Sequence, residues 1–106
     1  MNAPQLPEAT LDKQRAVLCL NGPVSFDTAL HLAEVGRSLI SRCAEQSSLS
    51  IDIRGVQQPS SATLTVVLEW WRAMNKRRIT LAEVRLPNQM APLVALSGLE
   101  QILPCR

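Results

Sequence analysis

The feature of this sequence that most constrains its fold is residues 49–71, LSIDIRGVQQPSSATLTVVLEWW. Leu49, Ile51 and Ile53 alternate with polar residues, and a period of two is typical of a strand with one buried face. After a short loop, residues 61–77 carry apolar side chains at helical spacing. We therefore expect a strand that leads into a helix beginning at Ser60-Ser61. Free backbone N–H groups and the positive end of the helix dipole would be available there to a partner or a phosphate.

The remaining periodicities predict the other elements of one small domain. Short apolar runs at residues 9–11 and 16–20 predict a hairpin, and residues 79–84 predict a further strand. Residues 27–46 are expected to form an amphipathic helix, with an apolar stripe of Ala29, Leu30, Ala33, Arg37, Ile40, Cys43 and Ala44 that Leu32, Val35 and Leu39 widen. Gly36 weakens the middle of this helix unless close packing requires it. Residues 88–97 predict a short last helix, with Pro92 in its first turn and Gly98 just after its end.

These elements follow the order β-β-α-β-α-β-α. Strand–helix–strand units force parallel neighbours with right-handed crossovers. We therefore expect an α/β domain with a small mixed four-stranded sheet and about three helices, mainly on one face. Within the 106 residues, we predict a flexible tail over residues 1–8, a domain over residues 9–103 that packs its end through Ile102 and Leu103, and a short tail over residues 104–106.

Composition and motifs exclude several classes of function. The net charge is +2 and the basic residues are expected to be scattered rather than clustered on one face, which argues against nucleic-acid binding. The three cysteines have no metal-ligand spacing, so neither a disulfide framework nor a zinc site is expected. Cys19 and Cys43 are expected to be small buried hydrophobes. The single histidine, His31, is expected at the surface. No nucleotide-binding or hydrolase motif occurs, and we predict neither an enzyme nor a cofactor.

The N-terminus and the hydropathy pattern indicate a protein of the cytoplasm. The N-terminal residues are polar and contain proline, and no apolar run approaches the roughly 20 residues that cross a bilayer. We predict a soluble protein that does not insert into a membrane and that only a partner would hold at one. Arg72, Lys76, Arg77 and Arg78 crowd the end of the second helix. We attribute them to the helix dipole rather than to a phosphate or lipid-headgroup patch.

The second helix carries two apolar rows. Its core face is expected to be Leu64, Val67, Leu68, Trp71 and Met74 or Asn75. A second row steps at the same spacing through Thr63, Val66, Trp70 and Ala73. Either a neighbouring helix or a partner covers this row, and we expect a partner, because tryptophan is enriched at binding hot spots. A shift of one residue in helix phase would exchange Trp70 and Trp71.

The chain resembles the STAS domain family over most of its length. One half of the resemblance is a strand reading LCLNGPV with Asp27 shortly after it, followed by a helix. The other half is a strand, a short loop with Ser60-Ser61, and a leucine-bearing helix. A strand containing Thr-Leu and a last helix ending Leu-x-x-x-Gly-Leu complete it. The family includes anti-sigma-factor antagonists, sulfate transporter tails and a subunit of a bacterial lipid transporter.

The loop shows how this chain departs from phosphorylatable members of the family. Their loop resembles Asp-Ser-[Ser/Thr/Ala]-Gly, with the phosphate added to the serine after the aspartate. Here Ser60 stands in place of the aspartate, Ser61 stands at the acceptor position and Ala62 stands where glycine is common. Ser61 is thus the candidate phosphoacceptor, although the acidic residue beside it is lost.

The lost aspartate makes the chain look most similar to the small STAS subunit of the phospholipid (maintenance of lipid asymmetry) ABC transporter. That resemblance implies a non-catalytic cytoplasmic protein, peripheral to the inner membrane, that binds the transporter's ATPase subunit. We expect the contacts at Ser60, Ser61, Thr63, Val66 and Trp70. The alternative is an anti-sigma-factor antagonist that works by partner switching through serine phosphorylation.

Overall fold

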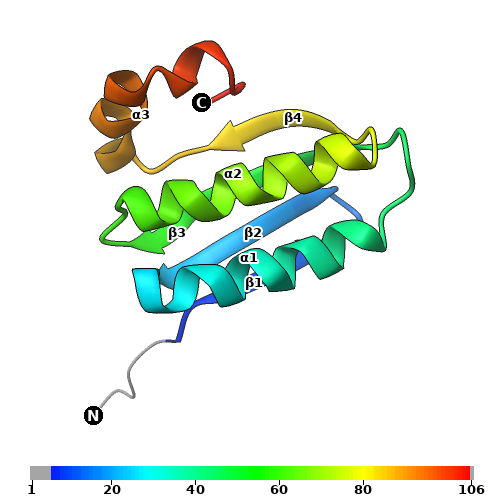
Figure 1. Cartoon of the computed structure of the whole chain (residues 1–106), viewed down its shortest axis with the longest axis horizontal. Coiled ribbons are helices and arrows are strands. Elements are labelled where there is room, and N and C mark those ends of the chain that lie inside the picture. Colours follow the sequence, from blue (N-terminus) through cyan, green and yellow to red (C-terminus); the bar gives the residue numbers. More distant parts are fainter. Residues whose placement is uncertain (1–5, 106) are drawn as a thin grey trace.

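A four-stranded mixed sheet organises the molecule, which is described here from a computed structural model of residues 6–105 (Figure 1). Its strands, β1 (Glu8–Asp12), β2 (Val17–Pro23), β3 (Ser48–Gln57) and β4 (Thr80–Arg85), lie side by side in chain order. β1 pairs antiparallel with β2, whereas β3 runs parallel to both β2 and β4. The predicted hairpin and parallel crossovers are confirmed. Residues 1–5 of the predicted N-terminal tail lie outside the described part of the chain.

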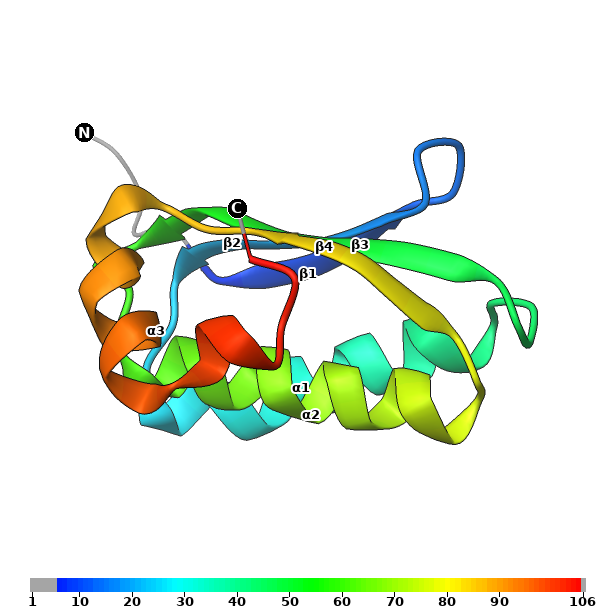
Figure 2. The same cartoon turned by 90° about the horizontal axis from the view of Figure 1, so that it is seen from above.

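The helices cover one face of this sheet, as Figure 2 shows. α1 (Phe26–Ser41) and α2 (Ser61–Lys76) lie next to each other with their N-termini at the same end. α1 ends before the predicted residue 46, because residues 42–47 form the turn and loop that lead into β3. Beyond β4 the chain forms two 3-10 turns, η1 (Asn88–Met90) and η2 (Leu99–Gln101), with α3 (Ala91–Ser97) between them. The predicted fold class and element order are confirmed.

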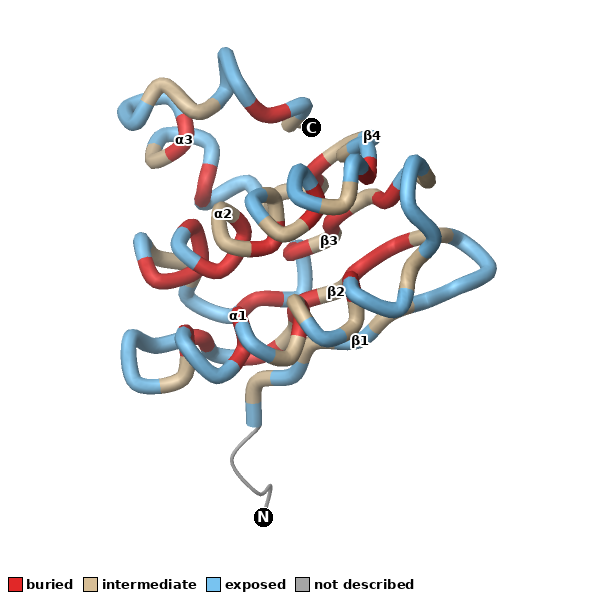
Figure 3. The backbone as a smooth tube through the Cα atoms, turned by 45° about the vertical axis from the view of Figure 1, so that its right-hand side comes forward, coloured by how far each residue is buried: buried red, intermediate tan, exposed pale blue. Residues whose placement is uncertain are grey.

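The hydrophobic core lies between the sheet and the two long helices (Figure 3). Strand residues at alternate positions, such as Leu18 and Leu20 on β2 and Ile51 and Ile53 on β3, are fully buried. This pattern agrees with the period of two in the sequence. The opposite face of the sheet carries polar side chains, among them Asp52 and Arg54.

The C-terminal segment returns to the sheet and pairs with β4. Gly98, with a φ of +76°, ends α3 in the left-handed conformation predicted for it, and Pro92 lies in the first turn. Leu103 is buried whereas Ile102 is exposed, so only one of the two residues expected to pack here does so. The Val84 N–H donates to the Pro104 carbonyl at 2.9 Å, and Cys105 bridges to Val84.

The structure corrects the expected faces of both long helices. Thr63, Val66 and Trp70, predicted to face a partner, are completely buried. The predicted core residues Leu68 and Trp71 are instead half-buried. The buried face of α1 also differs from the expected one, because Leu30, expected in the core stripe, is 73% exposed.

The first helix, rather than a partner, covers the second row of α2. The Trp70 indole N–H donates to the Leu32 carbonyl of α1 at 3.2 Å. A Cβ atom on Gly36 would lie 1.9 Å from Trp70 Nε1, so the indole occupies the space that glycine leaves open. The alternative of cover by a neighbouring helix is therefore the correct one, and close packing explains Gly36.

Candidate partner-binding site

The start of α2 is held by hydrogen bonds within the chain. Ser60 Oγ accepts the Ala62 N–H at 3.2 Å, and the Ser60 N–H donates to Thr63 Oγ1 at 3.2 Å. This reciprocal arrangement is a capping box, which satisfies donors that a helix N-terminus otherwise leaves free. Ser60 and Thr63 therefore hold the helix start in place, and Thr63 is too deeply buried to meet a partner.

Ser61, unlike Ser60, is exposed and has a hydroxyl that the helix cap does not use. It is the first residue of α2. Within residues 6–105 its hydroxyl makes no hydrogen bond, whereas its carbonyl accepts the Thr65 hydroxyl at 3.1 Å. The first turn carries no acidic residue to offset the positive end of the dipole. Of the predicted site residues, Ser61 is thus the one that offers a free polar group to a partner.

Two exposed apolar residues of α1 belong to the same end of the molecule. Phe26 is 70% exposed and Leu30 is 73% exposed. Because they are four residues apart on a helix, their side chains lie on one face. Exposed large apolar side chains that gather in this way are typical of interaction surfaces.

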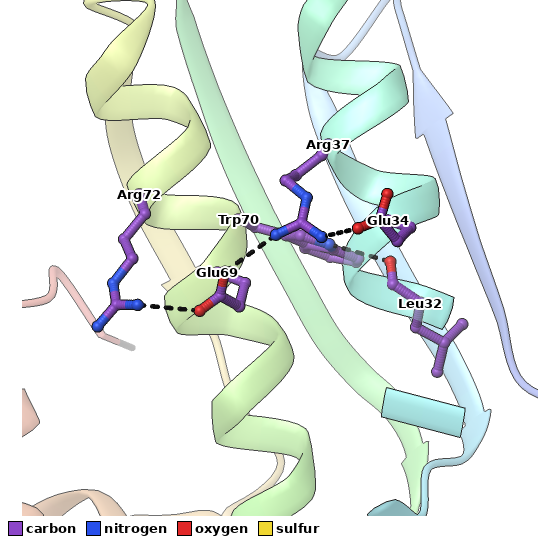
Figure 4. Close-up of polar contacts among 6 residues, drawn as sticks. All are labelled: Leu32, Glu34, Arg37, Glu69, Trp70 and Arg72. Atoms are coloured by element: carbon purple, nitrogen blue, oxygen red, sulfur yellow. Dashed lines mark hydrogen bonds and ion pairs between the residues drawn. The ribbon is translucent and has the colours of Figure 1, made fainter. Parts of the chain in front are cut away.

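An ion-pair network shows which residues of α1 and α2 lie opposite each other along the two helix axes. Arg37 of α1 contacts Glu69 of α2 at 3.0 Å, and Figure 4 shows both in a chain of charges with Glu34 and Arg72. Two turns toward the N-terminus of each helix lie Leu30 and Ala62. The exposed apolar pair of α1 is therefore level with the first turns of α2.

We define the docking surface as Phe26, Leu30, Ser61 and Thr65, all of which are exposed. It replaces the buried row of Thr63, Val66 and Trp70. Sequence reasoning missed both apolar residues, because it expected Leu30 in the core stripe and expected the helix to begin after Phe26. The buried side of α1 is complete without them, since it consists of Ala29, Leu32, Ala33, Gly36 and Ile40. This spacing of three and four residues is the sequence signal that could have predicted Phe26 and Leu30 to be exposed.

Other chemistry-bearing groups lie away from the docking surface. Cys19, Cys43 and Cys105 are free thiols, half-buried rather than fully buried, and burial raises the pKa of Cys19 and of Cys105. Hydrogen bonds from Arg54 lower the pKa of Asp52. Within residues 6–105, no group of three or more His, Cys, Asp or Glu side chains could hold a metal ion. No helix in this part of the chain is long and apolar enough to cross a membrane.

The mixed sheet, the helices on one face and the exposed serine at the start of α2 define a small α/β domain of the STAS type. A family model described as "Mlab, STAS domain" matches residues 8–104. Because this match spans nearly the whole chain, the protein belongs to the STAS domain family and is MlaB-like. A comparison with curated proteins gave no match.

Proposed function

We propose that this chain is a non-catalytic subunit of a phospholipid-transporting ABC complex that maintains the lipid asymmetry of the outer membrane. In this role it binds the ATPase subunit in the cytoplasm and is held at the inner membrane through that partner. The observation that carries the proposal is the free Ser61 hydroxyl in the first turn of α2, at the same level along the helices as exposed Phe26 and Leu30 of α1, in a domain of the MlaB-like kind.

The docking surface indicates what the ATPase subunit must provide. Phe26 and Leu30 require an apolar pocket, because burying each of them gains roughly 1.5–3 kcal/mol. Ser61 requires a hydrogen-bond partner in that interface, since a buried hydroxyl without one costs roughly 1–3 kcal/mol. The capping box keeps Ser61 in place before binding, so little ordering of the loop is needed.

Affinity purification of the tagged chain from its native cell tests the partner directly. We expect an ABC ATPase to copurify with permease and substrate-binding subunits. With that ATPase purified, Ser61→Arg and Leu30→Glu should each weaken binding by at least about 10-fold, because each places a charge in the contact. Both residues are exposed, so the thermal midpoint of the free chain should stay near that of the wild type.

Matched variants at other exposed positions serve as controls. Ser41→Arg adds the same charge at the far end of α1, and Ile102→Glu adds the same acid to an exposed residue near the C-terminus. Both should bind the ATPase as the wild type does. Unchanged binding of Ser61→Arg and Leu30→Glu would refute the docking surface. Trp70→Glu is not a test of binding, since Trp70 is fully buried and its replacement would unfold the helix pair.

The second candidate function is partner switching through phosphorylation of Ser61. The exposed hydroxyl at the positive end of a 16-residue helix favours it, because a phosphate there is electrostatically stabilised. A small kinase-like protein, instead of an ABC ATPase, would then copurify. The intact mass of the protein from growing and stressed cells should show a phosphorylated form that Ser61→Ala removes. An unmodified mass under both conditions would exclude this function.

A further inference from the structure

Basic residues that are far apart in the sequence gather at one end of the molecule. The turn between β1 and β2, the residues after α1 and the end of α2 all lie opposite the N-termini of α1 and α2 (Figures 1 and 2). We call this the basic end, and its cations are Lys13, Arg15, Arg42, Lys76, Arg77 and Arg78. Its acidic residues are Asp12 and Glu45. The interpretation that the basic residues are scattered is therefore wrong for the folded chain.

Pairing distinguishes these cations from the others. Elsewhere in residues 6–105, each arginine is ion-paired: Arg37, Arg54, Arg72 and Arg85. At the basic end, Arg15 lies 4.0 Å from Asp12, and Arg77 donates to the Cys43 carbonyl. Lys13, Arg42, Lys76 and Arg78 are exposed and have no ion pair within the described residues. The unpaired cations of the described chain thus all lie at this end.

The geometry of the basic end favours a broad anionic surface over a single phosphate. A surface hollow of about 250 Å³ lies here, and its lining includes Lys13 and Arg42 as well as apolar Leu11 and Leu49. α1 and α2 end rather than begin here, and the negative ends of their dipoles disfavour a phosphate held against the backbone. Long exposed cations that reach outward from three segments instead suit a planar layer of anionic headgroups.

The same end lacks what single-stranded nucleic acid requires. Such sites combine a basic groove with aromatic side chains on which bases stack. The aromatic residues are elsewhere: Phe26 lies at the opposite end, Trp70 is buried, and Trp71 lies in the third turn of α2.

We propose that the basic end binds the surface of a membrane that contains anionic phospholipids. This contact is separate from the docking surface at the other end, so one molecule can hold a protein partner and lie against a bilayer at the same time. It would add to the attachment through a partner, and it departs from the expectations that only a partner would hold the chain at a membrane and that the cations after α2 serve the helix dipole alone. It does not depend on the identity of the partner, because the basic end belongs to the chain alone.

Cosedimentation of the purified full chain with vesicles tests the proposal without any partner. We expect binding to vesicles of phosphatidylcholine mixed with phosphatidylglycerol, and little binding to phosphatidylcholine alone. Lys13→Gln combined with Arg42→Gln should weaken binding by roughly 30-fold. Binding should also weaken as salt rises, because exposed charges are screened beyond about 8 Å at physiological ionic strength.

A variant with the same change in net charge is the control. Arg54→Gln combined with Arg85→Gln removes two ion-paired cations near the C-terminal ends of β3 and β4, opposite the basic end, and it should bind nearly as well as the wild type. Equal weakening in both double variants would overturn the proposal, since net charge alone would explain binding. Binding to soluble polyglutamate but not to anionic vesicles would also overturn it and would indicate an acidic protein segment as the occupant.

Discussion

At the scale of single residues, Gly36 and Trp70 determine how closely α1 and α2 approach. The Trp70 indole packs where Gly36 has no side chain. Its N–H donates to the Leu32 carbonyl, which lies one turn before Gly36 on α1. Glycine in a helix interior normally costs about 1 kcal/mol relative to alanine. The chain tolerates that cost because the space is filled by the largest fully buried side chain of the core.

Replacement of Gly36 by alanine tests this contact, because the packing and the helix propensity change the free energy of unfolding in opposite directions. The methyl group would overlap Trp70, which is fully buried and cannot move aside freely. Overpacking costs about 1–3 kcal/mol, more than the gain of about 1 kcal/mol in helix propensity. Urea unfolding should therefore show a lower free energy of unfolding for Gly36→Ala, whereas the exposed control Ser38→Ala should change it by less than about 0.5 kcal/mol. A stabilised Gly36→Ala would contradict the packing.

The ion pair between Asp52 and Arg54 links stability to pH. Arg54 donates to both carboxylate oxygens, at 3.1 and 2.9 Å, and these hydrogen bonds hold the pKa of Asp52 below its ordinary value of 3.8. A lowered pKa in the folded state stabilises the fold above the ordinary pKa, and this contribution is lost as the pH falls through the lowered pKa. Arg54→Gln should thus reduce the free energy of unfolding near neutral pH.

Unfolding measured at several pH values checks the sign of this effect. The difference between wild type and Arg54→Gln should be constant above about pH 5 and should shrink below about pH 4. A difference that grows on acidification would show that the carboxylate is not the group stabilised by Arg54.

At the scale of elements, α1 and α2 begin with the same capping pattern, a serine followed three residues later by a threonine. Ser25 and Thr28 precede and open α1 as Ser60 and Thr63 do for α2, and in each case the threonine Oγ1 accepts the N–H of the serine. Capping is local, so each helix start is determined by four consecutive residues. This places Ser61 at the first helical position, and in the folded chain Ser61 is exposed there.

Removal of the cap should separate the roles of the two adjacent serines. Ser60→Ala loses the bond to the Ala62 N–H and should lower the free energy of unfolding by about 1 kcal/mol. Ser61→Ala should change it by less than about 0.5 kcal/mol, because its hydroxyl makes no hydrogen bond in the described chain. Chemical denaturation of the two variants side by side measures both values. Equal losses would mean that Ser61 also holds the helix.

At the scale of the whole molecule, the C-terminal segment completes the domain. Leu103 is 3% exposed, and the neighbouring backbone pairs with β4, whose edge would otherwise be open. Open edge strands invite pairing with other chains. The residues after η2 therefore protect the sheet, although their sequence predicts little more than a tail.

Leu103→Ala tests this role. The cavity should lower the free energy of unfolding by about 2 kcal/mol or more. The segment should also open locally, so the amide proton of Val84, which donates to Pro104, should exchange faster than the amide protons of β2. Hydrogen exchange measured residue by residue distinguishes this from uniform destabilisation, which would leave the order of protection unchanged.

Sequence by itself determined the element order, the start of α2 and the end of α3 at Gly98. These depend on periodicity, capping and backbone conformation, which act over a few residues. It also led to the resemblance that the family match confirms.

Only the tertiary structure decided which faces are buried and which groups meet. Adjacent residues on a helix differ by about 100° in direction, so Trp70 and Trp71 exchange faces with a shift of one position. The position of α1 settled this choice in favour of burying Trp70, and it left Phe26 and Leu30 exposed at the end where α2 begins. The basic end likewise exists only in the fold, because parallel crossovers bring the turn after β1 and the ends of both long helices to the same side.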